Sequence, residues 1–572
     1  MRIEKVRIEG FRNFEEAEFD FGDKTLVLGP NDSGKTNLLY ALRILFDPGF
    51  SARQFELSSS DFNVASSASH VAIIVNLCDV DEPCLVSSFG GKLREGHTTI
   101  AFSADLGGDY RFLAGPDADE LEEVSSRFYI KHLVLEYVNS TRDAAAFLKR
   151  SQDDLLEVAR NARGDIAVTE DAASVEHIQA ELEVLNEGIS NLHYIADALS
   201  SVNDEMSRMS SLNEGCEARL VAGNTDAGKL LDNLQLAYLS SDSPLTFGGE
   251  GRNNQLFFST WLSRRNIKRP VEKVSIVAIE EPEAHLHPQQ QRALAAYLAN
   301  RIQGQVIVTT HSPQIVEPFT SDALIRIGGG GRPVCSGVDL RDAIDGLGYR
   351  LNPIVSEVFF SRGVLLVEGP SEVILYKRLA AVAGIDLDRE NLTVISVDGV
   401  GFKPYVLCCE GLGIPWVIRT DNDVFKVPKN ERYRLAGFAR AYDVASLLGS
   451  ASLEAEWKYC FDMMAWGPLP DVPEETMRAA KRLRAMFEEV GVYLATVDLE
   501  SDLIAGPLHG ILSTHYGIQD NEGLYQTMTQ RKAENMHSFV GAHGDDLALL
   551  IDDPICAPLK KLKALVSKPA CR

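Results

Sequence analysis

Residues 29–36 constrain the fold of this chain more than any other segment. They are Gly-Pro-Asn-Asp-Ser-Gly-Lys-Thr, a complete G-x4-G-K-T loop between apolar segments at 25–28 and 37–46. In a strand–loop–helix unit of this kind, backbone N–H groups hold phosphates at the helix N-terminus, the lysine neutralises the outer phosphates and the hydroxyl ligates magnesium. We therefore predict an α/β domain that binds ATP with Mg²⁺ through Asn31, Ser33, Gly34, Lys35, Thr36 and Asn37.

A second predicted strand ends in carboxylates far downstream. Residues 276–279 are apolar and lead into Glu280 and Glu281, which is the arrangement of a Walker B strand. We expect Glu280 to coordinate magnesium through water and Glu281 to act as the base that activates water. Aspartate is usual at the first position, so Glu280 departs from the pattern and weakens the expectation of efficient hydrolysis.

Two further motifs fit the same nucleotide site. His311 ends the strand predicted at 305–309 and suits contact with a γ-phosphate, although alone it would be an ordinary capping histidine. Residues 248–252, with Gly249 and Gly251, resemble the signature loop of ABC-type ATPases, although alone they would be a hairpin turn. In that superfamily the signature loop completes the site of a second subunit, so we expect ATP to lie between two heads.

Carboxylates also follow two apolar strands in the C-terminal part. Glu368 ends the strand predicted at 363–367, with Glu372 on the helix after it, and Asp421 and Asp423 end the strand predicted at 416–420. Neighbouring parallel strands deliver such side chains to one edge of the sheet. Oxygen ligands suit Mg²⁺ or Mn²⁺, which can stabilise both the attacking and the leaving oxygen at phosphorus. This arrangement resembles the Toprim pattern. A third strand-like segment, 495–497, leads to Asp498 and Glu500.

Bulk properties narrow the class of protein. The 572 residues suggest roughly three to four domains, and no apolar run approaches the ~18 residues of a membrane helix. The net charge of −26, from 82 acidic and 56 basic residues, argues against a protein that coats DNA by neutralising phosphates. The start of the chain alternates apolar and charged residues and does not resemble a signal peptide. The nine cysteines are scattered without any C-x2-C pair, which fits a cytoplasmic location.

The motifs occur in the order found in OLD-family nucleases, which join an ABC/SMC-type ATPase to a Toprim nuclease domain. The sequence resembles that family over essentially its whole length, and within it the nuclease subunits of Gabija anti-phage systems. The segments that carry the resemblance are 31–43, 280–283, 367–372, 420–423 and 498–503.

The resemblance implies roles for individual residues. It makes Glu368, Asp421, Asp498 and Glu500 metal-site residues, with Glu372 and Asp423 in support, and it makes Lys532 an active-site lysine that stabilises charge at the phosphate. It also implies two Mg²⁺ or Mn²⁺ ions per site, double-stranded DNA as substrate, and a homodimer or homotetramer. A UvrD-like helicase would be the partner subunit, and the role would be bacterial anti-phage defence under nucleotide control.

The expected organisation is α/β throughout. We expect an ABC/SMC-type P-loop ATPase in two parts, 1–142 and 236–345, separated by a helical dimerisation insertion at 143–235. The insertion is poor in glycine and has apolar residues spaced by three and four. A Toprim nuclease domain with a C-terminal helical region would occupy 346–572.

Three functions compete on these observations. The first is a metal-dependent DNA endonuclease controlled by nucleotide. The second is a Toprim topoisomerase or primase, but a primase would bring a zinc module and a topoisomerase a dedicated strand-transfer domain, and neither is recognisable here. The third is an ATP-dependent DNA repair scaffold of the SMC/ABC type, which would leave the carboxylates idle. We expect the first.

Overall fold

The computed structural model describes residues 1–140, 153, 156–209, 226–232, 238–240, 243–245, 250–267, 273–319, 322–328, 333–338, 357–399, 401–427, 432–467 and 472–567. By its internal contacts the chain forms two compact units. One comprises residues 1–139, 274–283 and 288–572, and the other comprises 140–273 and 284–287. No helix within the described ranges is long and apolar enough to cross a bilayer.

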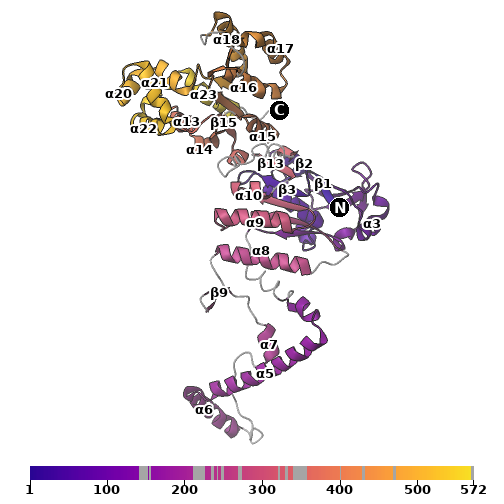
Figure 1. Cartoon of the computed structure of the whole chain (residues 1–572). Helices are drawn as coiled ribbons and strands as arrows, with labels where there is room; N and C mark the ends of the chain where they lie inside the picture. Colours follow the sequence, from indigo (N-terminus) through magenta and orange to yellow (C-terminus); the bar gives the residue numbers. More distant parts are fainter. Residues whose placement is uncertain are drawn as a thin grey trace. The chain divides into compact units, whose positions relative to one another are not determined.

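The N-terminal part of the first unit contains an antiparallel sheet whose strand order is β2-β1-β4-β5-β6-β7. Its strands β1 and β2 are labelled in Figure 1. Along β1, side chains alternate between the core and the solvent, because successive residues of a strand point to opposite faces. The strands are β1 (Arg2–Phe11), β2 (Phe14–Asp20), β4 (His70–Cys78), β5 (Thr98–Asp105), β6 (Tyr110–Gly115) and β7 (Glu122–Val124).

A second sheet of this part has the order β14-β13-β3-β12-β11-β8, and only β14 is antiparallel to its neighbour. Its central strands are buried on both faces, which explains their continuous apolar sequences. The strands are β3 (Lys24–Leu28), β8 (Leu133–Val138), β11 (Val274–Glu280), β12 (Val306–Thr310), β13 (Ala323–Ile327) and β14 (Pro333–Val338).

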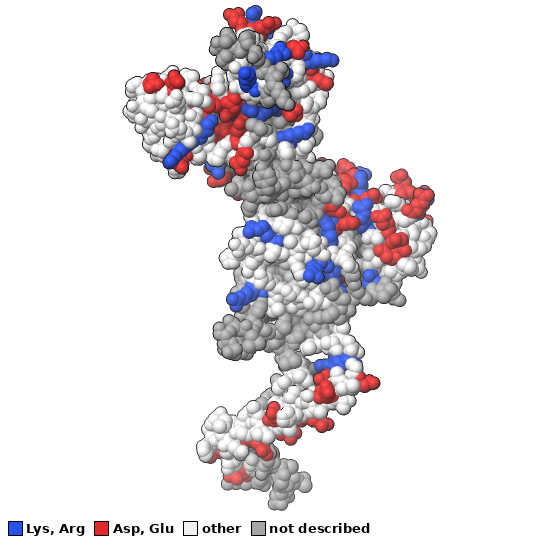
Figure 2. Space-filling view, viewed as in Figure 1, with Lys and Arg blue, Asp and Glu red and all other residues white. Residues whose placement is uncertain are grey.

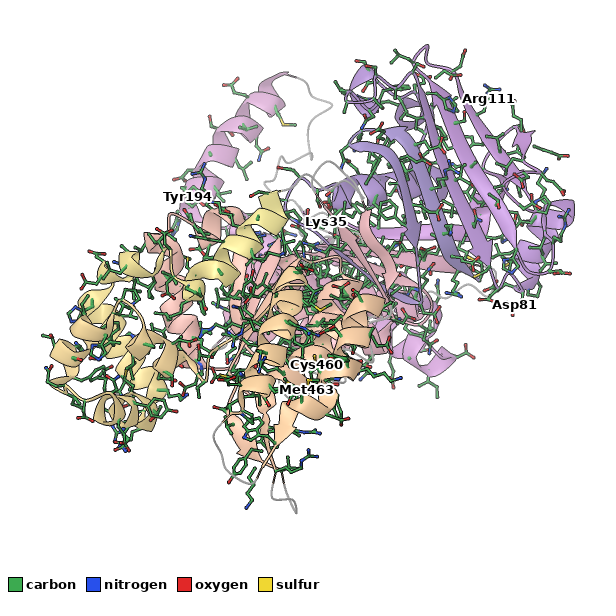
Figure 3. The ribbon with its side chains drawn as sticks, turned by 90° about the horizontal axis from the view of Figure 1, so that it is seen from above. Lys35, Asp81, Arg111, Tyr194, Cys460 and Met463 are labelled. Carbon is green, nitrogen blue, oxygen red and sulfur yellow. The ribbon has the colours of Figure 1, made fainter. Side chains whose placement is uncertain are left out.

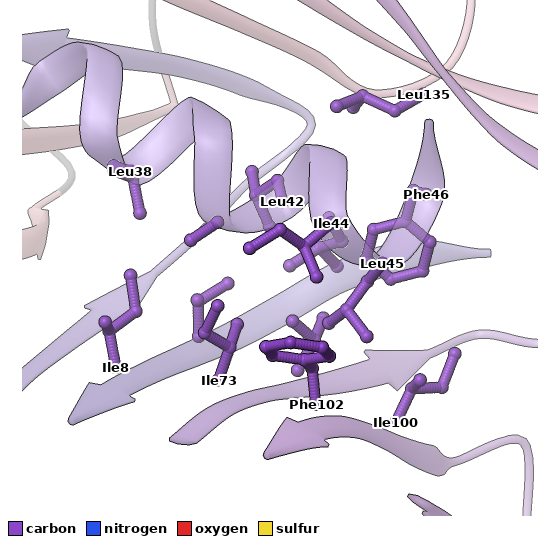
Figure 4. Packing of buried hydrophobic residues seen from close by; sticks show 14 of the residues in the cluster. Ile8, Leu38, Leu42, Ile44, Leu45, Phe46, Ile73, Ile100, Phe102 and Leu135 are labelled. Carbon is purple, nitrogen blue, oxygen red and sulfur yellow. The ribbon is translucent and has the colours of Figure 1, made fainter. Parts of the chain in front are cut away.

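Helix α1 (Lys35–Phe46) belongs to the core that both sheets share (Figure 4). Leu38, Leu42 and Leu45 are fully buried in one cluster with Ile73 and Phe102 of the antiparallel sheet. This burial fixes the direction of α1, and with it the phosphate loop at its N-terminus. Other helices of this part are α2 (Ala52–Phe55), α3 (Pro83–Phe89), α9 (Pro288–Arg301) and α10 (Pro313–Phe319).

Two helices of the second unit expose several large apolar side chains. None of the residues of α5 (Asp165–Ser190) is buried, and Val184 and Leu185 are 69% and 53% exposed. On α6 (His193–Met209), Tyr194 is 72% exposed (labelled in Figure 3). The unit also includes α7 (Ala227–Asp232), β9 (Tyr238–Ser240), β10 (Ser243–Leu245) and α8 (Glu250–Ile267). The domain boundaries expected from the sequence stay predictions.

The C-terminal part of the first unit is built on a four-stranded parallel sheet with the order β16-β15-β17-β21. The strands are β15 (Gly363–Val367), β16 (Leu392–Ser396), β17 (Trp416–Thr420) and β21 (Val492–Leu494). A separate small sheet joins β18 (Val424–Lys426), β19 (Tyr433–Leu435) and β20 (Ala465–Trp466).

Helices surround this parallel sheet and form its buried cluster with β15, β16 and β17. The helices with buried side chains in this cluster are α13 (Pro370–Val382), α19 (Leu499–Ala505), α20 (His509–Tyr516), α21 (Asn521–Gln530), α22 (Lys532–His543) and α23 (Ala557–Ser567), and Leu387 of α14 (Leu387–Glu390) packs against it. The other helices of this part are α15 (Lys403–Gly411), α16 (Ala436–Ala445), α17 (Ala451–Cys460) and α18 (Glu474–Glu489).

Most of the expected elements occur at the expected residues, but the third carboxylate segment differs. The strand there is β21, which ends at Leu494, and residues 495–497 lie outside it. Asp498 is the N-cap of α19, and Glu500 lies in the first turn of that helix. The expectation of a strand leading directly to Asp498 was therefore wrong. The Asp-x-x-Ser spacing favours a helix start, because the carboxylate accepts a hydrogen bond from the Ser501 N–H.

Candidate functional site

The phosphate loop lies between β3 and α1, as the motif requires (Lys35 is labelled in Figure 3). Gly34 has a φ of 112°, a conformation that side chains rarely adopt. Lys35 is buried, and its Nζ donates hydrogen bonds to the carbonyls of Gly29 at 2.8 Å and Pro30 at 3.0 Å. Burial lowers the pKa of Lys35, and the negative charges of Glu281, Glu283 and Glu280 offset part of this decrease. The lysine therefore folds back over the loop that phosphates would fill.

Residues from the β1–β2 turn support this loop, and the sequence reasoning missed them. The Asn13 side chain donates to the Ser33 carbonyl at 2.8 Å and accepts from Asn37 Nδ2 at 2.7 Å. Arg12 Nη1 donates to Asn37 Oδ1 at 2.9 Å. Asn13 also lies so close to Gly34 that a Cβ there would collide with it. Asn31, at the outer side of the loop, is exposed.

The Walker B strand brings Glu280 to the start of α1. The Thr36 hydroxyl donates to Glu280 Oε1, and the Tyr137 hydroxyl donates to Glu280 Oε2 at 2.5 Å. Thr36 and Glu280 are the pair that the sequence predicts around magnesium. Tyr137 lies on β8, next to β11 in the sheet, and no motif in the sequence indicated it.

His311 contacts the acidic residues that follow β11. Its Nδ1 lies 3.3 Å from Glu281 Oε1 and 3.5 Å from Glu283 Oε1. The hydrogen bond to Glu281 raises the pKa of His311 and lowers the pKa of Glu281. Burial raises the pKa of Glu283, which accepts hydrogen bonds from the Thr310 hydroxyl at 2.5 Å and the His311 N–H at 3.0 Å. Glu283 therefore ties the end of β12 to the segment after β11.

The expected signature loop is only partly described. Gly249 lies outside the described residues, and Gly251 lies in the first turn of α8. Because α8 belongs to the second compact unit, Gly251 is not placed relative to the phosphate loop. The signature assignment stays a prediction.

A pocket of about 200 Å³ lies at the carboxyl ends of β15 and β17 in the C-terminal part. Four carboxylates and one lysine from five elements or their ends line it: Glu368, Glu372, Asp421, Glu500 and Lys532. Figure 2 shows acidic side chains gathered on this part of the chain with Lys and Arg beside them. Asp423 is exposed and does not line the pocket, and its carbonyl accepts a hydrogen bond from the Ala436 N–H.

In Glu372 and Glu500, one carboxylate oxygen accepts a hydrogen bond from the protein and the other has no hydrogen-bond partner among the described residues. Glu372 Oε2 accepts from the Gly369 N–H at 2.6 Å, and Glu500 Oε2 accepts from Lys532 Nζ at 2.8 Å. Glu372 Oε1, Glu500 Oε1 and Asp421 Oδ1 are buried without a hydrogen-bond partner among the described residues. Buried carboxylate oxygens without partners are costly unless something binds them.

The raised pKa values of two pocket carboxylates also indicate that a bound cation would stabilise their charged forms. Burial, with a contribution from Asp421, raises the pKa of Glu372 to about 8. Burial and the charge of Glu368 raise the pKa of Asp421 to about 7. A divalent cation would offset both the repulsion and the desolvation, and oxygen-only donors suit Mg²⁺ or Mn²⁺. The residues present therefore fit such an ion, with Glu368, Glu372, Asp421 and Glu500 as its candidate ligands.

As they stand, these side chains do not form a closed metal cage. No group of three or more His, Cys, Asp or Glu side chains in the described ranges is arranged to hold an ion. Two of the carboxylates form ion pairs with cationic side chains: Glu500 with Lys532 at 2.8 Å, and Glu368 with Arg440 at 3.0 Å. Asp498 differs from the others because both of its oxygens are engaged, by the Ser501 N–H at 2.8 Å and the Tyr525 hydroxyl at 2.8 Å.

The fold and the two sites define a class of protein, one that joins an ATP-binding P-loop domain to a Toprim domain. A family model described as "AAA ATPase domain" matches residues 1–82 and 135–316. A second, "Overcoming lysogenization defect protein-like, TOPRIM domain", matches residues 359–423. Both matches are those of an OLD-family nuclease, and the chain is similar to members of that family over most of its length.

Named relatives cover most of the chain. Endonuclease GajA of Bacillus cereus (strain VD045) is 26% identical over 94% of this chain and 95% of its own length. OLD nuclease of Thermus scotoductus is 26% identical over 74% of this chain and 83% of its own length. The Smc head domain of Pyrococcus furiosus, solved bound to a domain of ScpA, is 14% identical with a TM-score of 0.37, and covers 61% of this chain and 99% of its own.

Proposed function

We propose that this chain is a divalent-metal-dependent DNA endonuclease whose cutting is controlled by nucleotide at the ATPase domain, and that it acts in bacterial anti-phage defence. The observation that carries the proposal is the pocket in which Glu372, Asp421 and Glu500 each keep a buried oxygen beside Lys532, and these oxygens have no hydrogen-bond partner in the part of the chain that the structure describes. Mg²⁺ or Mn²⁺ bound there would stabilise charge at a phosphodiester. Lys532 would hold a proton and a positive charge beside the same phosphate.

The nuclease pocket and the nucleotide site differ in whether their chemistry needs an energy supply. Hydrolysis of a phosphodiester is downhill and requires positioning and charge stabilisation, not an energy supply. A nucleotide site joined to such a centre therefore suits control of access better than driving the chemistry. Named relatives such as GajA support the nuclease assignment, and a UvrD-like helicase remains the partner that we propose from the same resemblance.

We also propose a homodimer or homotetramer that assembles through the helices of the second unit. Exposed large apolar side chains on α5, on α6 and between the two helices support this, since an interface with another subunit would bury apolar surface that a monomer leaves in water. The relevant side chains, each at least 45% exposed, are Ile166, Val168, Val184, Leu185, Leu192, Tyr194 and Val202. Light scattering that gives a monomer at micromolar concentration, with and without ATP, would refute the assembly.

The test of function is a plasmid assay with purified full-length chain. Supercoiled DNA incubated with Mg²⁺ or Mn²⁺ should become nicked or linear, and EDTA should prevent this. Relaxed, covalently closed product would indicate a topoisomerase instead. Unchanged DNA, with ATP binding intact, would indicate an ATP-dependent repair scaffold. Repeating the assay across ATP concentrations tests the control by nucleotide.

A further inference from the structure

Arg440 on α16 contacts the ends of both strands that carry the proposed metal ligands. Its Nη2 donates to Glu368 Oε1 at 3.0 Å and to the Asp421 carbonyl at 2.6 Å, and its Nε donates to Thr420 Oγ1 at 3.1 Å. Glu368 directly follows β15, and Thr420 and Asp421 end and follow β17. One planar guanidinium thus connects two neighbouring strand ends, which a flexible ammonium group could not do with the same geometry.

The contacts of Arg440 leave the Glu368 carboxylate with one defined orientation. Glu368 Oε1 accepts from Arg440, from the Thr420 hydroxyl and from the Asp421 N–H at 2.9 Å. All of these hydrogen bonds end on Oε1, so Oε2 is the oxygen left to face an ion. Both side chains of the ion pair are mostly buried, at 18% exposed for Arg440 and 15% for Glu368. Solvent therefore screens this pair less than a surface salt bridge.

The backbone is arranged to let α16 approach this point. A Cβ at Gly437 would lie 2.5 Å from the Asp421 carbonyl oxygen and 2.9 Å from Asn422 Oδ1. The Ala436 N–H also donates to the Asp423 carbonyl at 2.9 Å, which starts the helix directly beside β17. Arg440 follows Gly437 by three residues, so it lies on the same face of α16. A larger residue at 437 would separate this face from the metal ligands.

We propose that Arg440 is a positioning residue of the nuclease site, which holds Glu368 and Asp421 in the orientation that accepts a divalent cation. The inference rests on the proposed function, because it assigns Arg440 to that same site. Partners that orient metal ligands from outside the coordination shell typically change metal affinity by about 10- to 100-fold when removed. The main effect of replacing Arg440 therefore falls on metal affinity and not on the rate at saturating metal.

The experiment measures Mn²⁺ binding directly, by electron paramagnetic resonance of free Mn²⁺, on EDTA-treated full-length chain without nucleotide. Arg440→Ala and Arg440→Lys should each weaken binding about 10- to 100-fold at unchanged stoichiometry. In plasmid cleavage the half-saturating Mn²⁺ concentration should rise by the same factor, while the maximal rate stays within a few-fold of wild type. Methylguanidinium should shift Arg440→Ala back toward wild type. Arg478→Ala, at an exposed arginine of α18 paired with Glu474, is the matched control.

Two results would overturn the assignment of Arg440. One is wild-type Mn²⁺ affinity in both variants. The other is a loss of the maximal cleavage rate at unchanged Mn²⁺ affinity, which would indicate that Arg440 contacts the DNA substrate and does not orient a metal ligand. If Arg440→Ala does not fold, as judged by circular dichroism, Arg440→Lys decides the question. A wild-type chain that binds Mn²⁺ in an Arg440-dependent way but leaves plasmid intact would refute the proposed function and keep the positioning role.

Discussion

Lys532 Nζ donates a hydrogen bond to Glu500 Oε2 at 2.8 Å and lies 3.6 Å from Asp498 Oδ2. Burial alone would lower the pKa of Lys532, but the hydrogen bond to Glu500 and the charges of both carboxylates outweigh it and raise the pKa. The lysine is therefore charged throughout the physiological range. Asp498 at the N-cap of α19, Glu500 in its first turn and Lys532 at the start of α22 thus form one charged group at the edge of the pocket.

Replacing Lys532 should separate catalysis from metal binding. We expect Lys532→Met to lower plasmid cleavage by at least about 100-fold, because a positive charge near the phosphate is lost. Mn²⁺ affinity should change little, since Lys532 contacts Glu500 and Asp498 and does not join the ends of β15 and β17 as Arg440 does. Lys560→Met, at an exposed lysine of α23, serves as the control. Wild-type cleavage by Lys532→Met would return Lys532 to an ordinary surface residue.

The carboxylates of β15 and β17 should be required for cleavage but not for nucleotide binding. Glu368→Gln and Asp421→Asn conserve size while removing the negative charge that an ion needs. We expect each to reduce nicking to background, while ATP binding measured by calorimetry stays within about two-fold of wild type. Asp443→Asn, at an exposed position of α16, should cut normally. Robust nicking by either site variant would remove the metal-site assignment.

The phosphate-loop lysine should control the response to ATP. Lys35→Ala should bind ATP at least about ten-fold more weakly, because the positive charge at the outer phosphates is gone. Its cleavage in nucleotide-free buffer should equal that of wild type and should not change when ATP is added. Lys5→Ala, on the exposed face of β1, provides the comparison. A Lys35→Ala chain that never cuts, beside a wild type that needs hydrolysable ATP, would indicate a powered enzyme.

Tyr137 should matter for magnesium-dependent ATP hydrolysis and not for DNA cleavage. The Tyr137 hydroxyl donates a hydrogen bond to Glu280 Oε2 at 2.5 Å. Glu280 occupies the position where aspartate is usual and has a longer side chain. Tyr137→Phe removes this hydrogen bond, so the Glu280 carboxylate is less well oriented. We expect ATP hydrolysis with Mg²⁺ to fall about three- to ten-fold, as for loss of one hydrogen bond to a charged group. Nucleotide-free plasmid cleavage should be unchanged. Equal hydrolysis by Tyr137→Phe and wild type would show that Thr36 orients Glu280 without help.

The metal-free chain should lose stability as the pH rises. Folding raises the pKa of Asp421 to about 7 and of Glu372 to about 8. At any pH between the pKa of such a group in the unfolded chain and its pKa in the folded chain, the folded chain binds more protons than the unfolded chain. The free energy of unfolding must then decrease as the pH rises through this window, by on the order of 1 kcal/mol per pH unit for each group.

Urea unfolding of EDTA-treated protein from pH 5 to pH 8.5 checks this. Glu372→Gln should flatten the decrease, because the amide has no charged form to disfavour. Added Mg²⁺ should stabilise the wild type more at pH 8 than at pH 6, since the ion replaces the protons. Unfolding energies that rise with pH in EDTA would contradict the predicted direction.

The sequence by itself determined the local units that carry the chemistry. A strand, a glycine-rich loop and an apolar helix occur at 25–46 as predicted, because loop backbone and helix N-terminus are set by residues adjacent in the chain. The strand ends at Glu280, Glu368 and Asp421 were predictable for the same reason, since apolar runs that end in carboxylates give parallel strands with ligands at one edge.

Only the tertiary structure decided which distant side chains complete each site. Arg440 lies 72 residues from Glu368, and Tyr137 lies 143 residues from Glu280, in segments that carry no motif. Their contacts depend on which helix or strand packs beside which strand end, and that packing is set by the whole core. The start of α19 after its Asp498 N-cap was also missed: residues 495–497, expected as strand, lie between β21 and α19, and the capping hydrogen bond to the Ser501 N–H begins a helix there.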